Sequence, residues 1–185
     1  SELSIKIGNY IFQTKTDLIN AISSWIDDQD NTERTYGDIN TWDVSQITDF
    51  SELFQDKTSF NSDISNWNVR NGTDFSYMFY EVSEFDQDLS EWDVSNGTNF
   101  SRMFGGAEEF NQDIGSWDVS NGTDFSGMFF RTYDFNQDIG NWDVSNGIDF
   151  SNMFNGAEEF NQDIGSWDVS NGTDFSQTFY GAKSF

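Results

Sequence analysis

The stretch WDVSNGTDFS at residues 117–126 decides the fold of this chain. An Asn-Gly pair between two apolar runs is a strong short-range signal for a β-hairpin. The same ten letters return at residues 167–176, however, and close variants stand at 92–101 and 142–151. The pair therefore marks one corner of a repeated unit rather than the turn of a hairpin.

The repeated unit is 25 residues long and runs without insertion. Aromatic residues keep this spacing in several columns, and Phe125 and Phe129 stand in two of them. A further column holds Trp42, Trp67, Trp92, Trp117, Trp142 and Trp167. Periods of about 20 to 50 residues are typical of stacked repeats, in which one unit cannot bury its apolar side alone. We therefore expect these tryptophan and phenylalanine columns to form the core.

Within one unit the apolar spacing changes. Trp117 and Val119 alternate with polar residues, as in a short strand with one buried face. Phe125, Met128 and Phe129 follow the spacing of one helical turn. The sequence thus predicts a repeat solenoid of the leucine-rich-repeat kind, with a short parallel strand and one helical turn in each 25-residue coil. About six coils would span residues 37–185, the last one truncated.

Residues 1–36 do not repeat and are expected to form an N-terminal capping segment with a helix at about 16–27. Leu18, Ile22 and Trp25 share one face of this helix. A cap is needed because the end of a solenoid exposes apolar surface and unpaired backbone. At the other end the chain stops at Phe185 inside a repeat. We expect the natural protein to continue there, or the last coil to be covered, for instance by end-to-end self-association.

Composition restricts the classes of function. With 8 Lys and Arg against 33 Asp and Glu, the net charge is -25, so binding to nucleic acid or to an anionic membrane surface is not expected. No run approaches the roughly 20 apolar residues of a membrane span. The chain has neither Cys nor His, which excludes thiol nucleophiles, disulfides and imidazole-based triads. Its 20 Phe, 7 Trp and 6 Tyr indicate a folded protein.

An acidic face is the candidate contact surface, because alternation places the polar residues of each predicted strand outward. Its residues are Asp43, Asp93, Ser95, Asp118, Ser120, Asp143, Ser145 and Asp168. Carboxylates about 4.8 Å apart in neighbouring coils repel one another. Calcium could relieve this repulsion at Asp93, Asp118, Asp143 and Asp168. The sequence lacks the known calcium-binding repeat patterns, so a solvated or partner-binding face stands beside the calcium alternative, and no other cofactor is expected.

The segment FNQDIGSWDVSNGTDFSGMF at 110–129 resembles the repeat of the BspA-like leucine-rich-repeat surface proteins. This is a bacterial and mycoplasma lipoprotein-type family of unknown function, and the resemblance covers about residues 37–185. It implies a secreted or cell-surface protein for adhesion or partner binding, and it supplies no catalytic residue. Gly122 and Phe125 depart from the family pattern, in which valine and methionine are usual. We expect the larger ring to fill the space left by the valine.

The resulting functional prediction is a non-enzymatic extracellular or cell-surface protein for adhesion, partner recognition or spacing, with a protein or glycan as partner. A polysaccharide-active enzyme using paired carboxylates is the alternative, although almost every acidic residue is a copy present in all repeats and catalysis needs one asymmetric site. An ice- or mineral-binding surface is a further alternative. The glycosylation pattern Asn-Gly-Thr occurs at Asn71, Asn96, Asn121 and Asn171.

Overall fold

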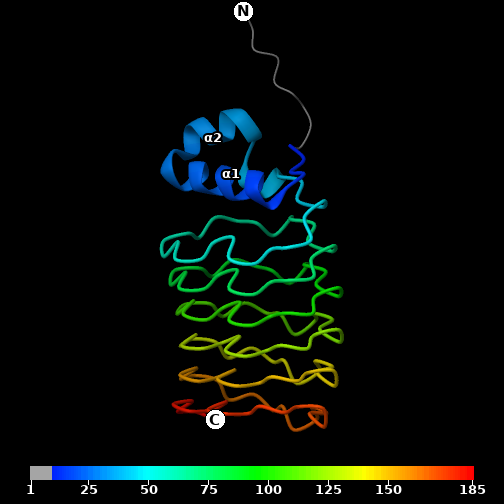
Figure 1. Ribbon diagram of the computed structural model, residues 1–185. Helices are drawn as coiled ribbons and strands as arrows, with labels where there is room; N and C mark the ends of the chain where they lie inside the picture. The colour runs from blue at the N-terminus through cyan, green and yellow to red at the C-terminus, as the bar shows by residue number, and fades with distance from the viewer. Residues whose placement is uncertain (1–9) are drawn as a thin grey trace, which may run out of the picture.

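The computed structural model describes residues 10–185. Two α-helices and a 3-10 helix precede the repeats: α1 (Lys15–Asp27), α2 (Gln29–Tyr36) and η1 (Ile39–Thr41). The 25-residue repeats then lie in successive layers beneath the helices, and the C-terminus lies in the last layer (Figure 1). The helices therefore cover one end of the stack.

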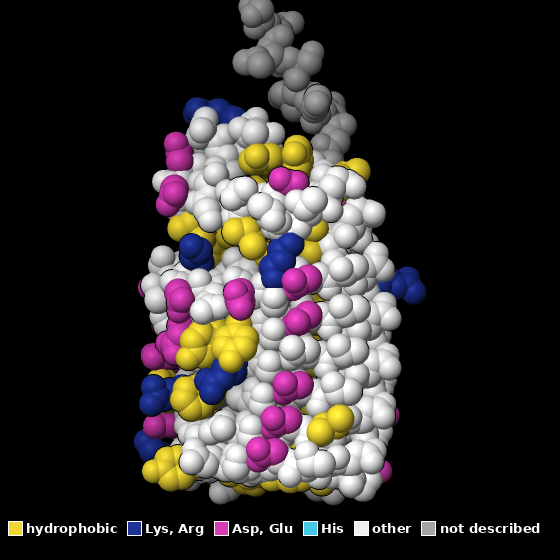
Figure 2. All heavy atoms as spheres, viewed as in Figure 1, with side chains coloured by type: hydrophobic (Ala, Val, Ile, Leu, Met, Phe, Trp, Pro, Cys, Tyr) yellow, Lys and Arg dark blue, Asp and Glu magenta, His cyan; other side chains and the backbone are white. Residues whose placement is uncertain are grey.

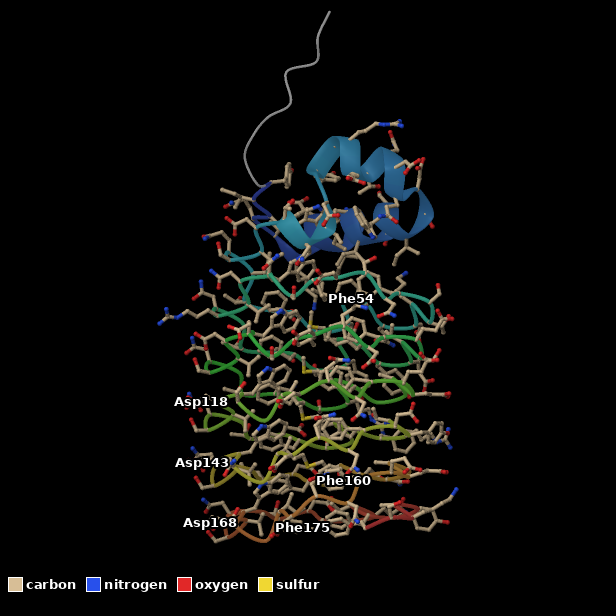
Figure 3. The ribbon with its side chains drawn as sticks, turned by 180° about the vertical axis from the view of Figure 1, so that it is seen from behind. Phe54, Asp118, Asp143, Phe160, Asp168 and Phe175 are labelled. Carbon is tan, nitrogen blue, oxygen red and sulfur yellow. The ribbon has the colours of Figure 1, made fainter. Side chains whose placement is uncertain are left out.

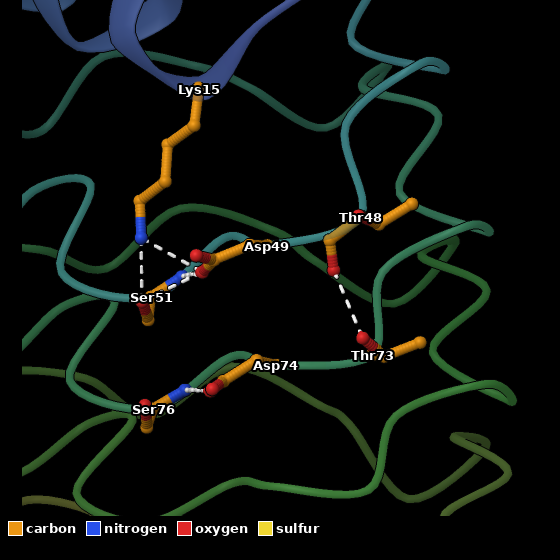
Figure 4. Close-up of polar contacts among 7 residues, drawn as sticks. All are labelled: Lys15, Thr48, Asp49, Ser51, Thr73, Asp74 and Ser76. Atoms are coloured by element: carbon orange, nitrogen blue, oxygen red, sulfur yellow. Dashed lines mark hydrogen bonds and ion pairs between the residues drawn. The ribbon is translucent and has the colours of Figure 1, made fainter.

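Helix α1 begins at a threonine cap and is tied to the first layer. The hydroxyl of Thr14 accepts a hydrogen bond from the backbone N–H of Asp17 at 3.1 Å, which satisfies one of the free donors at the helix start. The Lys15 ammonium donates to Asp49 Oδ1 at 2.8 Å and to Ser51 Oγ at 2.5 Å (Figure 4). The apolar face of α1 is buried against the first layer through Leu18, Ala21, Ile22 and Trp25.

The predicted leucine-rich-repeat solenoid, with a short parallel strand in every coil, is wrong. Within residues 10–185 there is no β-strand, and consecutive layers share only isolated parallel bridges such as Asp124 with Asp149. The reason lies in local turns. Trp117 N–H donates to the carbonyl of Ile114 at 3.1 Å, and an equivalent turn closes at Gly122. These turns use N–H groups that a strand would direct to its neighbour, so the alternation of apolar residues reflects consecutive tight turns.

The predicted helical turn is wrong as well. Gly127, in the middle of that segment, has a left-handed backbone with φ of 60°. On either side, the N–H groups of Phe125 and Phe129 donate to the carbonyls of Asp149 and Met153 in the next layer, both at 2.9 Å. Hydrogen bonds along the stack therefore replace the bonds to the preceding turn that a helix would form.

The core consists of stacked aromatic columns. The ring of Phe125 lies between those of Phe100 and Phe150, with ring centroids 5.7 and 5.6 Å apart. The indole N–H of Trp117 donates to the carbonyl of Leu89 in the preceding layer at 2.9 Å, so this buried donor is satisfied. The residues of the expected core that are buried are Trp42, Trp67, Trp92, Trp117, Trp142, Phe125 and Phe129. Trp167 is only partly buried.

The last layer exposes apolar side chains. Phe175 and Phe185 are 45% and 53% exposed, whereas the equivalent Phe150 and Phe160 one layer earlier are buried. Figure 3 shows Phe175 in this layer. End-to-end self-association through it stays a prediction.

Candidate functional site

The acidic contact surface expected from the sequence runs along one edge of the stack. Asp118, Asp143 and Asp168 lie one below another on this edge (Figure 3). Their side chains are exposed, whereas the neighbouring Ser120 and Ser145 are half-buried. Because this part of the repeat is a series of turns, the surface is a turn edge rather than the face of a strand.

The aspartates on this edge are engaged by their own turns. Asp118 Oδ1 accepts the backbone N–H of Ser120 at 3.0 Å. Asp93 Oδ1 accepts both the hydroxyl of Ser95 at 2.6 Å and its N–H at 3.1 Å. This arrangement is the Asx turn, in which a short polar side chain caps the backbone two residues on. Hydrogen bonds from the serine hydroxyl and N–H hold the pKa below its usual value in Asp93, Asp143 and Asp168.

This edge offers few oxygen ligands for the calcium ion that the sequence left as an alternative. Within residues 10–185 no three acidic side chains gather in a way that could hold a metal ion. Each layer supplies one carboxylate at most, and its Oδ1 is already bonded to the turn in Asp93, Asp118, Asp143 and Asp168. Calcium takes about six to eight oxygen ligands, more than such a column can direct to one point.

Other polar columns connect the layers. Asn121 Nδ2 donates to the carbonyl of Ser95 at 2.8 Å, and the Thr123 hydroxyl donates to the carbonyl of Thr98 at 3.1 Å. The threonine column that motivated the ice-binding alternative is thus bonded to backbone; Figure 4 shows the first such bond, from Thr73 to Thr48. Sequence reasoning missed a further ladder, in which Gln112 Nε2 donates to Asp86 Oδ1 at 2.8 Å.

Sequence variation among the repeats gathers in a different region, the turn at residues 52–58 and its equivalents. Several positions of this turn vary between repeats, while the tryptophan column and the phenylalanine columns stay constant. One variable position holds Tyr80 and Phe130, and two others share an unusual backbone conformation. The first of them holds Glu52, Tyr77, Arg102, Gly127, Asn152 and Gln177. The second holds Asp56, Glu81, Gly106, Arg131, Gly156 and Gly181.

Both positions have a left-handed backbone in every layer. Arg102 and Arg131 have φ of 52° and 54°, and the equivalent Gly127 and Gly156 have 60° and 78°. This conformation costs a residue with a Cβ about 1–2 kcal/mol, whereas glycine adopts it freely. Glycine would therefore serve the fold at both positions, and the large side chains there are not required by the backbone.

Five of these turn residues form one group, the turn-face cluster: Tyr77, Tyr80, Arg102, Phe130 and Arg131. The Arg102 guanidinium carbon lies 5.9 Å from the Tyr80 ring centroid and 5.1 Å from that of Phe130, and the Arg131 guanidinium lies 5.0 Å from Phe130. The tyrosine rings meet edge to face at 5.3 Å. Figure 2 shows hydrophobic and basic side chains together on one flank of the stack, beside a line of acidic ones.

The large residues of these turns lie over small ones in the next layer. A Cβ atom added at Gly127 would lie 3.0 Å from Arg102 Cγ, and one added at Gly106 would lie 2.8 Å from Glu81 Cδ. Tyr80 covers Gly105 in the same manner. Comparison of equivalent positions in consecutive repeats is the sequence signal that could have found this arrangement. Glycine stands one repeat later at the positions of Tyr80, Glu81, Arg102 and Arg131.

A comparison with protein families matches residues 20–132 and 114–185 to the family described as Mycoplasma protein of unknown function, DUF285. The chain belongs to this family. The match confirms the resemblance at the level of the mycoplasma repeat family of unknown function, and the DUF285 description names no activity. Comparisons with curated proteins and with solved structures gave no match. In the part of the chain that the structure describes, no helix is both long and apolar enough to cross a membrane.

Proposed function

We propose that this DUF285 chain is a non-enzymatic recognition protein, secreted or on the cell surface, that binds a macromolecular partner. It does so through its turn face, the surface formed by the turn at residues 52–58 and its equivalents in the other repeats. The observation that carries the proposal is the contrast between the turn and the rest of the repeat. Packing and inter-layer hydrogen bonds account for the constant positions, whereas the turn varies and carries large side chains even at two positions where the backbone favours glycine. Arg131 is exposed and Arg102 half-buried, and a side chain that strains the backbone at such a position is consistent with a role outside the fold.

The residue types in the turn-face cluster support the same proposal. Tyrosine and arginine are enriched among the residues that dominate binding energy at protein interfaces. In this cluster they are held against one another, with Arg102 between two rings. Such mutual packing lowers the entropy lost on binding. The resemblance to BspA-like surface proteins supports adhesion and a surface location as the setting.

The polysaccharide-active enzyme remains the rival from another class. Glycoside hydrolysis needs two carboxyl groups with different environments. On the acidic edge the aspartates share one environment, the Asx turn, which repeats from Asp93 to Asp168. Incubation with a panel of polysaccharides, followed by assay for released sugars, tests this alternative. Release of sugar by the purified chain would favour the enzyme over the recognition protein.

Two variants separate the turn face from the acidic edge in a binding assay against arrayed extracellular proteins and glycans. The first simplifies two turns to the glycine pair found at 105–106, by Tyr80→Gly, Glu81→Gly, Phe130→Gly and Arg131→Gly. The second neutralises the edge by Asp93→Asn, Asp118→Asn, Asp143→Asn and Asp168→Asn, following the natural Asn68 at that position. We expect the first variant to lose binding and the second to keep it.

The reverse result would place contact on the acidic edge. An absence of binding by the wild-type chain across the panel would overturn the proposed function itself. Thermal melts of both variants serve as the folding control, because each replacement is a residue that another repeat already carries at the same position.

A further inference from the structure

We propose that the turn-face cluster binds an acidic polypeptide segment, with carboxylates of the partner paired to Arg102 and Arg131. This inference rests on the proposed recognition function and names the class of partner. It also identifies the two guanidinium groups as the residues that select that partner.

Charge is the first argument. The chain carries 8 basic against 33 acidic residues, yet two of its arginines, Arg102 and Arg131, lie over the same Phe130 ring. The three ion pairs found among residues 10–185 involve Lys15, Arg70 and Lys183, so neither Arg102 nor Arg131 has an acidic partner there. Two unpaired guanidinium groups against an acidic background form a local site for an anion.

Geometry is the second argument. The guanidinium carbons of Arg102 and Arg131 lie 5.1 and 5.0 Å from the ring centroid of the same residue, Phe130. Both groups thus contact the same ring, and a contact with a ring face leaves their hydrogen-bond donors free. A guanidinium presents a planar fork of N–H groups that matches a carboxylate with two parallel hydrogen bonds. Two neighbouring carboxylates, as in an acidic peptide segment, would therefore satisfy both forks.

Backbone conformation is the third argument. Arg102 and Arg131 adopt left-handed φ values of 52° and 54°, where other repeats carry Gly127 and Gly156. Arginine at these positions strains the backbone, by about 1–2 kcal/mol per residue. Within the fold the two arginines pack their aliphatic stems over Gly127 and Gly156 and their guanidinium groups against rings. None of these contacts uses the charge, which is consistent with a role in binding.

The ring arrangement favours a polypeptide over an anionic polysaccharide. Sugars bind aromatic residues through open ring faces, but Arg102 lies over Tyr80 and Phe130, and Arg131 lies over Phe130. The edge of one tyrosine meets the face of the other, Tyr77 against Tyr80. Four of the five residues of the turn-face cluster are half-buried and Arg131 is exposed, and tyrosine and arginine are enriched at the centre of protein–protein interfaces.

An immobilised copolymer of glutamic acid and tyrosine is the probe, with alginate and heparin as anionic polysaccharide arms. The test variant is Arg102→Gly/Arg131→Gly, which restores the glycine of other repeats. The matched control is Arg34→Ala/Arg70→Ser, which removes two exposed arginines elsewhere and so changes the net charge by the same amount. Serine stands at the position of Arg70 in the other repeats. A third variant, Arg102→Lys/Arg131→Lys, keeps the charge without the fork.

We expect the glycine variant to bind the copolymer at least about tenfold more weakly than wild type, the control to stay within about twofold, and the lysine variant to lie between them. Equal weakening in the control would overturn the inference, because it would show a general effect of charge. Arginine-dependent binding of alginate or heparin but not of the copolymer would also overturn it, in favour of a polysaccharide.

The proposed function can survive the failure of this inference. Suppose that the wild-type chain does not bind the copolymer, but that simplifying the two turns abolishes binding of the partner found in the panel. Recognition by the turn face then stands, and the inference that the partner is an acidic segment is wrong. If the panel partner binds the glycine variant as well as wild type, the two arginines have no part in recognition.

Discussion

The ring of Phe125 fills the space in which a side chain at Gly122 would lie. A Cβ atom added at Gly122 would overlap Phe125 Cζ, and one added at Gly72 would lie only 2.5 Å from Phe75 Cζ. Both positions are buried. This relationship gives a physical reason for the two departures from the family pattern, since the phenylalanine can reach this space only where the turn carries glycine.

A Gly122→Val substitution is therefore expected to overpack the core and to cost about 1–3 kcal/mol of unfolding free energy. Phe125→Met alone also destabilises, because it removes a ring stacked between two others. The double variant should lose less than the sum of the two single losses, by about 1 kcal/mol or more. Urea denaturation of the three variants measures this coupling; additive losses would contradict it.

The first repeat shows how the ring can move. There Ile47 stands in place of the glycine and is buried together with Phe50. The Phe50 ring approaches within 2.9 Å of the place of a Cβ at Gly72 in the next layer. A β-branched residue is thus tolerated in the turn when the following layer has glycine. We expect Gly122→Val/Gly147→Val to lose more stability than the two single changes together, because the ring of Phe125 then has no free space on either side.

The indole ladder offers a second test. Trp117 is buried and its N–H donates to the carbonyl of Leu89 at 2.9 Å. Trp117→Phe removes this donor, although the Leu89 carbonyl keeps the hydrogen bond from the backbone N–H of Trp92 at 3.1 Å. The lost hydrogen bond should cost about 0.5–1.5 kcal/mol in addition to the lost volume. The equivalent Trp167 is only partly buried, and its N–H bonds Ile139 at 3.1 Å. Trp167→Phe is the matched control and should lose clearly less unfolding free energy in the same urea experiment. Equal losses would show that burial of the tryptophan does not decide the cost.

The equivalent glycines Gly140 and Gly165 should differ in how well they tolerate a side chain, because only Gly140 has a further layer stacked on it. A Cβ atom at Gly140 would overlap the backbone oxygen of Asp163 in the next layer. At the equivalent Gly165 the nearest atom is the flexible Oδ1 of Asp163 at 3.1 Å. Ser65 and Ser90 occupy this position in two earlier layers, so the cost at Gly140 is that of adjusting a backbone set for glycine. We expect Gly140→Ser to destabilise by about 1 kcal/mol and Gly165→Ser to have little effect, as judged by thermal melts. Similar melting temperatures for the two variants would show that the backbone at Gly140 moves aside.

The period and the buried columns could be predicted from the sequence, because the hydrophobicity of a repeated position decides which side it takes. The local backbone could not. Alternation of Trp117 and Val119 is the same in a strand and in consecutive turns, and only the direction of the N–H groups separates them. The left-handed turn was hidden too, because the position of Arg102 and Tyr77 holds glycine in only one of six repeats, although glycine adopts this backbone most readily. The turn-face cluster was missed for the same reason.

Calcium should have no specific effect on stability. The Oδ1 atoms of Asp118 and Asp143 accept hydrogen bonds from their own turns, and each layer offers a single carboxylate to the acidic edge. We expect the melting temperature in calcium to match that in magnesium at equal ionic strength within about 2 °C, since both ions then act by screening. Melts in calcium, magnesium and chelator measure this. A rise of many degrees in calcium alone would establish a metal ladder and overturn the account of the acidic edge.

The Asx turns make a contribution to stability that depends on pH. The Ser95 hydroxyl is the main cause of the lowered pKa of Asp93, with further contributions from the Ser95 N–H and from Arg70. Because the pKa in the folded state is below the value of about 3.9 for an unfolded chain, the ionised carboxylate stabilises the fold above that value. The contribution is lost as the pH falls through the lowered pKa. Asp93→Asn should therefore destabilise at pH 7, and its difference from wild type should shrink below about pH 4.

Val94→Ala is the control for this experiment, because it shortens a buried side chain that does not titrate. Its loss of unfolding free energy should therefore be the same at about pH 7 and about pH 3. Ser95→Ala tests the cause, since loss of the hydroxyl should raise the pKa of Asp93 toward its usual value in a carboxyl NMR titration. If the cost of Asp93→Asn is unchanged between pH 7 and pH 3, the charge of Asp93 does not contribute, and the turn is held by the neutral hydrogen bond that asparagine also accepts, as Asn68 does from the N–H of Arg70.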